Sequence, residues 1–157
     1  MGKPWASALA LVVCLALSFG AGAAGALFQP GEWYAALRKP ALTPPGWVFG
    51  VVWPALYALM GVAAWLVWRK GGWGENRLAL GLFAIQLVLN AAWTCIFFGL
   101  HRPGWALLDL AAMWAMILAT LIAFWLRAPV AGALLIPYLA WVSFAAYLNF
   151  TFWRLNN

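Results

Sequence analysis

Apolar residues along this chain fall into long uninterrupted segments, which short groups of charged, glycine and proline residues separate. A helix needs about 20 apolar residues to cross the hydrocarbon core of a bilayer. Five segments meet that length, at about 5–27, 47–68, 78–100, 105–126 and 130–153. We therefore predict an all-α integral membrane protein, a bundle of five transmembrane helices forming one domain over residues 1–157.

The first apolar segment has features of both a signal peptide and a membrane helix. Lys3 precedes it, and Ala-x-Ala patterns occur at 21–23 and 24–26, as in cleaved leaders. The apolar stretch is longer than that of a usual leader, so we interpret it as a retained helix. Small residues recur every four positions in two rows, Ala16, Gly20 and Ala24, and Ala21 with Gly25. This spacing lets helices pack closely, and it fits packing within the bundle as well as a dimer contact.

The connection over residues 28–46 is the one long loop that the pattern predicts. It combines four prolines with two adjacent aromatic residues, namely Pro30, Pro40, Pro44, Pro45, Trp33 and Tyr34. Long loops in compact proteins are commonly functional, and proline restricts the backbone. We expect this loop to form an ordered cap over one mouth of the bundle.

Composition agrees with a membrane protein and excludes a soluble enzyme. The chain is 68% hydrophobic and 8% charged, whereas soluble domains carry about 25% charged residues. Its net charge of +6 comes from basic residues at the ends of apolar segments, as in membrane proteins, so we expect no nucleic-acid partner. One side would carry Lys3, Arg69, Lys70, Arg77 and Arg127, and the other Arg38, Lys39, Arg102 and Arg154. This near-even division assigns no orientation.

Four of the predicted helices carry polar or aromatic residues at helical spacing. Residues three or four positions apart share one face of a helix, and polar side chains inside a membrane point inward. The shared faces are Trp53, Tyr57 and Met60; Gln86, Asn90 and Trp93; Trp105, Asp109, Ala112 and Met116; and Trp141, Ala145 and Leu148. Converging inward, they would line a cavity walled by indoles, which suits a large, flat, mostly apolar ligand.

These residues also have structural interpretations. Gln86 and Asn90 fit hydrogen bonds that tie helices together as well as contact with a ligand. Asp109 fits pairing with an arginine or backbone capping as well as ligand contact. Trp53 and Trp141 lie deeper in their segments than an interfacial belt requires, so they are the stronger ligand candidates. The tryptophans near segment ends fit membrane-interface anchors, namely Trp5, Trp68, Trp73, Trp125 and Trp153.

Residues for the common catalytic mechanisms are scarce. One histidine, His101, and three acids leave little for general acid–base catalysis. The sequence contains no metal-ligand cluster and no phosphate-binding glycine loop, and Cys14 and Cys95 form no disulfide or metal pattern. We therefore expect no conventional catalytic residue, no metal site and no required cofactor.

Many short motifs occur in a specific order along nearly the whole chain. They are Trp33-Tyr34, Lys39-Pro40, Pro44 to Gly50, Val52-Trp53, Leu56-Tyr57, Met60-Gly61, Gln86-Leu87, Leu89-Asn90, Trp93, Ile96 to Gly99, Gly104 to Leu107, Asp109, Pro137 to Trp141, Leu148-Asn149 and Trp153-Arg154. In these motifs the chain strongly resembles the tryptophan-rich sensory protein/translocator protein family (TspO/MBR), also called peripheral benzodiazepine receptors. Each motif is weak alone, but their number and order make the resemblance specific.

The resemblance implies a five-helix bundle, usually a homodimer, whose first loop closes a ligand pocket. Family members bind porphyrins such as protoporphyrin IX and haem, cholesterol in animals, and synthetic isoquinoline or benzodiazepine ligands. Bacterial relatives are associated with stress and oxygen signalling, so we expect a porphyrin receptor or sensor in the membrane of a bacterial cell envelope. The matching motifs place Tyr34, Trp53, Gln86, Asn90, Trp93, Trp105, Trp141 and Ala145 in the ligand pocket, and the shared helix face adds Asp109.

Two further functions follow from the same resemblance. One is transport of tetrapyrroles or sterols. The other is light-dependent degradation of porphyrin, for which Trp53 and Trp141 match the tryptophans implicated in the family. The cholesterol-recognition pattern of animal members is broken here, because Phe150 stands where that pattern has tyrosine. We therefore expect no animal-like cholesterol affinity, although the pocket could still admit a sterol.

Overall fold

The computed structural model describes residues 4–157, so Lys3 lies outside the described part of the chain. The described part is helical and contains no strand. Five of its helical segments are long and apolar enough to cross a membrane, which confirms the predicted all-α membrane fold. The elements are α1 (Pro4–Gly25), α2 (Glu32–Ala36), α3 (Gly46–Trp68), α4 (Gly72–Thr94), the π-helical turn η1 (Cys95–Gly99), α5 (Pro103–Arg127), α6 (Pro129–Ala133) and α7 (Ile136–Leu155).

Two membrane segments differ in detail from the expected ranges. The third begins at Gly72, several residues before the expected start, and continues through η1 to Gly99. The fifth is divided into α6 and α7, which together span Pro129–Leu155. Pro137 lies in the first turn of α7, where its missing N–H leaves no bond unmade. The division lies at the turn of Leu134 and Leu135, shortly before that proline.

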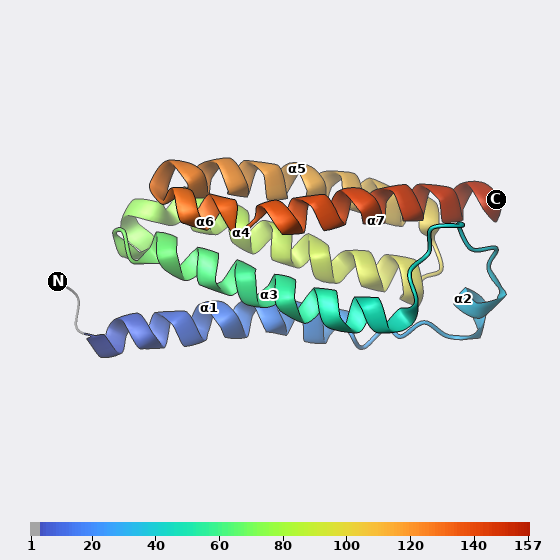
Figure 1. The fold of residues 1–157 in the computed structure, drawn as a ribbon, viewed down its shortest axis with the longest axis horizontal. Helices are drawn as coiled ribbons and strands as arrows, with labels where there is room; N and C mark the ends of the chain where they lie inside the picture. The colour runs from blue at the N-terminus through green and yellow to red at the C-terminus, as the bar shows by residue number, and fades with distance from the viewer. Residues whose placement is uncertain (1–3) are drawn as a thin grey trace.

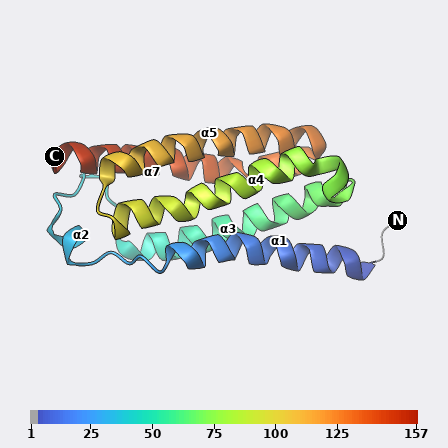
Figure 2. The same ribbon diagram turned by 180° about the vertical axis from the view of Figure 1, so that it is seen from behind.

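The long helices lie side by side in an elongated bundle (Figures 1 and 2). α1 packs along α3 and α4 at one side of the bundle, while α5 packs against α4 and α7 at the opposite side. α2 and the C-terminal end of α7 lie at one end, and the α3–α4 turn lies at the other end. We call these the cap end and the distal end.

Glycines on α1 and α3 bring these two helices into close contact. A Cβ atom added at Gly61 of α3 would lie 2.9 Å from the backbone Cα of Leu15 on α1. One at Gly22 of α1 would collide with the ring of Tyr57 on α3. Of the two small-residue rows expected on α1, the one ending at buried Gly25 packs within the bundle, against Thr94. The row of Ala16, Gly20 and Ala24 is exposed.

The inward faces of the helices form one apolar core that runs along the bundle. On α5 the buried positions are Ala106, Leu110, Met113, Ile117, Thr120 and Phe124. The face expected to point inward, which carries Trp105 and Asp109, is therefore rotated away from the centre. Either face of α5 could be buried, because the helix is apolar nearly all round, and packing against α4 and α7 decides which one is.

Candidate ligand-binding site

A chain of hydrogen bonds joins α3, α4 and α7 in the middle of the bundle. The Tyr57 hydroxyl donates to Asn90 Oδ1 at 2.8 Å, and Asn90 Nδ2 donates to the Tyr138 oxygen at 3.0 Å. The Tyr138 hydroxyl donates in turn to Gln86 Oε1 at 2.8 Å. Gln86 Nε2 lies 3.8 Å from the sulfur of Met60. We call Tyr57, Asn90, Tyr138 and Gln86 the polar chain.

The polar chain accounts for the amides that the sequence placed inside the membrane. Asn90 is 3% exposed, Gln86 is 1% exposed and Tyr138 is fully buried. A buried polar group without a partner is costly, and here each amide oxygen and each phenol oxygen is bonded to another helix. Interhelical hydrogen bonding, one of the two interpretations of Gln86 and Asn90, is therefore realised in this structure.

Tryptophans of α3 and α7 lie beside the polar chain. The Trp53 ring stacks on Tyr57, with centroids 5.5 Å apart and planes inclined by 25°, and meets Tyr138 edge-on at 6.4 Å. Trp141 makes an edge contact with Phe49 at 5.6 Å. Both indoles are partly buried against the core. The Trp141 indole nitrogen is itself buried and has no hydrogen-bond partner within residues 4–157.

Trp93 is held by a second set of hydrogen bonds closer to the cap end. Its indole N–H donates to Asn149 Oδ1 at 3.0 Å, and Asn149 Nδ2 donates to the carbonyl of Pro103 at 2.8 Å. Its ring stacks on Phe97 at 5.4 Å. Trp93 therefore links α4 to α7 and to the start of α5, with its donor already used.

The loop between α1 and α3 forms the expected ordered cap. Short helix α2 presents Tyr34 to a cluster of aromatic rings, with centroid distances of 5.4 Å to Phe98 and to Phe152. Asn156, just after α7, holds the loop by accepting from the Arg38 backbone N–H at 2.8 Å and donating to the Arg38 carbonyl at 3.0 Å. Burial raises the pKa of the Tyr34 phenol, so the ring packs in its neutral form.

The remaining predicted ligand residues lie on α5 and α7. Ala145 packs against the apolar core. Asp109 is partly buried on α5, and its Oδ2 atom has no hydrogen-bond partner among the described residues. Trp105 is 66% exposed and lines a groove of about 630 Å³ at the cap end, together with Trp33 and Trp153. The structure thus groups Trp53, Gln86 and Asn90, and places Trp105 on the outside of the bundle.

Two residues that organise this region lie outside the predicted set of ligand residues. Tyr138 occupies the centre of the polar chain, and Asn149 orients Trp93. A phenol and an amide within an apolar membrane segment are a usable signal, because each needs a partner there. What the sequence could not indicate is which partner each would find.

The arrangement suits binding better than acid–base chemistry. Tryptophan, tyrosine and phenylalanine rings supply flat apolar faces, and the unbonded Trp141 N–H supplies a donor. Among residues 4–157, no group of three or more histidine, cysteine or acidic side chains could hold a metal ion. What the arrangement offers is therefore aromatic surface and one unbonded hydrogen-bond donor.

Comparison with known proteins agrees with this architecture. The model of the TspO/MBR family matches residues 10–154. A Rhodobacter capsulatus protein named CrtK is 45% identical over 139 residues, covering 87% of this chain and 86% of that protein. The human translocator protein is 44% identical over 162 residues, covering 100% and 94%, and the tryptophan-rich protein TspO of Chlorobaculum tepidum is 44% identical over 153 residues, covering 94% and 96%. The chain is a multi-pass membrane protein that belongs to the TspO/MBR family.

Proposed function

We propose that this protein is a membrane receptor or sensor that binds porphyrins, such as protoporphyrin IX or haem, in its Trp-lined interior between α3, α4 and α7. Membership of a family that includes proteins named tryptophan-rich sensory protein and translocator protein supports a receptor or sensor role. Related large apolar molecules, such as sterols or isoquinolines, would use the same aromatic walls.

The unpaired Trp141 indole N–H is the observation that carries this proposal. A buried indole N–H normally has a hydrogen-bond partner, and this one has none among the described residues. A carboxylate or ring nitrogen of a porphyrin would accept from it. Partly buried Trp53 lies on the facing helix α3 and offers an aromatic surface for the macrocycle.

The loop that forms the cap would have to move for a porphyrin to enter the bundle. Tyr34 and its aromatic neighbours pack over the cap end of the bundle, so a porphyrin would enter as the loop is displaced. The polar chain stays intact in this scheme, because its atoms are bonded to one another. It would act as a rigid wall against which the ligand is positioned.

Quenching of tryptophan fluorescence by protoporphyrin IX tests the proposal in detergent or nanodiscs. We expect saturable quenching, and about threefold to tenfold weaker binding in Trp141→Phe, which keeps a ring but loses one hydrogen bond. Trp73→Phe is the matched control, because Trp73 is 61% exposed at the start of α4. Equal affinity in the wild type and Trp141→Phe would remove Trp141 from the site.

Light-dependent porphyrin degradation is the second candidate, and the Trp53–Tyr57 stack favours it. Trp53 and the Tyr57 phenol stacked on it at 5.5 Å are oxidisable groups that would lie beside a light-excited porphyrin, and dissolved dioxygen would be the oxidant that porphyrin breakdown consumes. Illuminated protoporphyrin should then lose absorbance with turnover in the wild type. Trp53→Phe or Trp141→Phe should abolish that loss while binding persists. Bleaching at the same rate without protein would refute this function.

A homodimer and a bacterial cell envelope remain predictions of the family resemblance. The exposed row of Ala16, Gly20 and Ala24 on α1 is a face on which a second copy could pack. Disulfide crosslinking of Gly20→Cys in native membranes tests this contact, and Gly50→Cys on the exposed side of α3 serves as the control. The sequences that match come from bacteria, an archaeon and mammals, so fractionation of the source cell is needed to locate the protein.

A further inference from the structure

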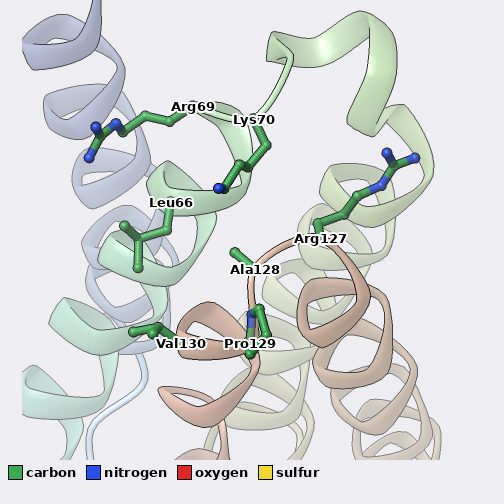
Figure 3. A pocket seen from close by; sticks show the side chains of 7 residues that line it. All are labelled: Leu66, Arg69, Lys70, Arg127, Ala128, Pro129 and Val130. Atoms are coloured by element: carbon green, nitrogen blue, oxygen red, sulfur yellow. The ribbon is translucent and has the colours of Figure 1, made fainter.

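A basic pocket lies at the distal end of the bundle, far from the cap (Figure 3). It has a volume of about 370 Å³, within the range of about 300–1,000 Å³ that is usual for ligand sites. The end of α3, the end of α5 and the start of α6 form it. Its lining residues are Leu66, Arg69, Lys70, Arg127, Ala128, Pro129 and Val130.

The lining combines positive charge with hydrocarbon and contains no acidic side chain. Two of the three cations are already engaged: the Arg69 guanidinium lies 4.8 Å from the Trp65 ring centre, and Arg127 donates to the Glu75 carbonyl at 3.0 Å. The Lys70 ammonium makes no hydrogen bond or ion pair with any residue in the described part of the chain. In Figure 3 it reaches into the space above Ala128, between the two arginines.

The acid at this end does not neutralise the pocket. Of the three acidic residues in the chain, only Glu75 lies at the distal end, in the first turn of α4. Its carboxylate packs over Gly71 and forms no ion pair with the cations among residues 4–157. No acid among residues 4–157 therefore forms an ion pair with the three cations that line the pocket.

The position of the pocket favours a lipid over a soluble anion. It lies where two membrane segments end, at Trp68 and Arg127, and where a third begins, at Pro129. Helix ends of this kind lie at the level of the lipid headgroups. Beside the cations, Leu126 and Val130 are 80% and 65% exposed, so hydrocarbon faces the bilayer next to the charge.

We propose that this pocket binds the headgroup of an anionic phospholipid. The phosphate contacts Lys70 and lies between Arg69 and Arg127, while an acyl chain runs along Val130 and Leu126. Basic pockets between transmembrane helices are a known mode of anionic lipid recognition. The site is separate from the aromatic interior and does not depend on the proposed porphyrin site.

Native mass spectrometry of the full chain tests this site. The protein is exchanged into an equimolar mixture of phosphatidylglycerol and phosphatidylcholine, and the ratio of the two retained lipids is measured. We expect the wild type to retain phosphatidylglycerol preferentially. Each neutralised cation should reduce that ratio by about fivefold, so Lys70→Gln combined with Arg127→Gln should nearly abolish the preference.

Matched variants make the result specific. Lys70→Arg keeps the charge and should keep the preference, and Arg154→Gln removes an exposed cation at the cap end and should have no effect. Circular dichroism and gel filtration establish that each variant is folded, and they do so independently of its affinity for porphyrin. An unchanged lipid ratio in the folded double variant would overturn the proposal. Displacement of the lipid by millimolar inorganic phosphate would also overturn it, by identifying a free-phosphate site.

Discussion

Replacing Tyr138 by phenylalanine removes a single oxygen atom from the centre of the polar chain. That oxygen accepts from Asn90 Nδ2 at 3.0 Å and donates to Gln86 Oε1 at 2.8 Å, so both amides lose a bond. The ring stays, and with it the edge contact to Trp53. Any change in stability therefore reports the two hydrogen bonds and very little packing.

The expected cost follows from the number of bonds lost. Interhelical hydrogen bonds in membrane proteins contribute about 0.6 kcal/mol on average, up to about 1.7 kcal/mol. Tyr138→Phe should therefore lower the free energy of unfolding by about 1–3 kcal/mol. Tyr57→Phe breaks only the bond to Asn90 Oδ1 and should cost about half as much. Tyr147→Phe, which changes an exposed phenol, should cost almost nothing.

Equilibrium unfolding in mixed detergent micelles, followed by near-ultraviolet circular dichroism, measures all three variants on one scale. The informative quantity is the order of the costs, with Tyr138→Phe above Tyr57→Phe and Tyr57→Phe above Tyr147→Phe. If Tyr138→Phe is no more destabilising than Tyr147→Phe, then the polar chain does not stabilise the bundle. The packing of the apolar core would then have to account for its stability.

Three further predictions concern the helix contacts and the cap. Gly61→Ala should destabilise the protein by about 1–3 kcal/mol through overpacking against α1. Gly50→Ala should not, because the space around Gly50 is open. Thermal unfolding of the two variants measures the difference in their stability. Asn156→Ala should speed protoporphyrin association and amide hydrogen exchange in the cap because it releases the loop, and Asn157→Ala should leave both rates unchanged. Burial raises the pKa of Tyr34 above 10.0. The contribution of its neutral phenol to cap stability is therefore complete below pH 10 and is lost as the pH rises through the raised pKa. Tyr34→Phe should remove this alkaline loss of cap stability, which tryptophan fluorescence follows.

The membrane fold could be predicted from local properties of the sequence. Whether a segment crosses a bilayer depends on the length and hydropathy of that segment alone, and all five predicted segments form membrane-length helices. The cap was predictable for a similar reason, because proline and aromatic residues between two apolar segments favour an ordered loop. Finer boundaries, such as the division of the last segment before Pro137, depend on local hydrogen bonding that hydropathy does not describe.

The candidate site was predictable only in part. Periodicity correctly grouped Gln86 with Asn90 on the buried face of α4. It failed on α5, where Trp105 shares a face with Asp109 but lies outside the core. A helix that is apolar on every side carries little information about its rotation, so contacts with its neighbours decide which face is buried.

By itself, the sequence determined that this protein is a helical membrane protein with a long aromatic loop and several polar groups inside its helices. Only the tertiary structure decided what those polar groups do, since Tyr138 and Gln86 are 52 positions apart in the chain and yet share a hydrogen bond. The same holds at the distal end, where Lys70 and Arg127 come together because α3 and α5 end side by side. The physical reason is common to both: the need of a buried polar group or a charge for a partner is local, but the identity of the partner depends on how the helices pack.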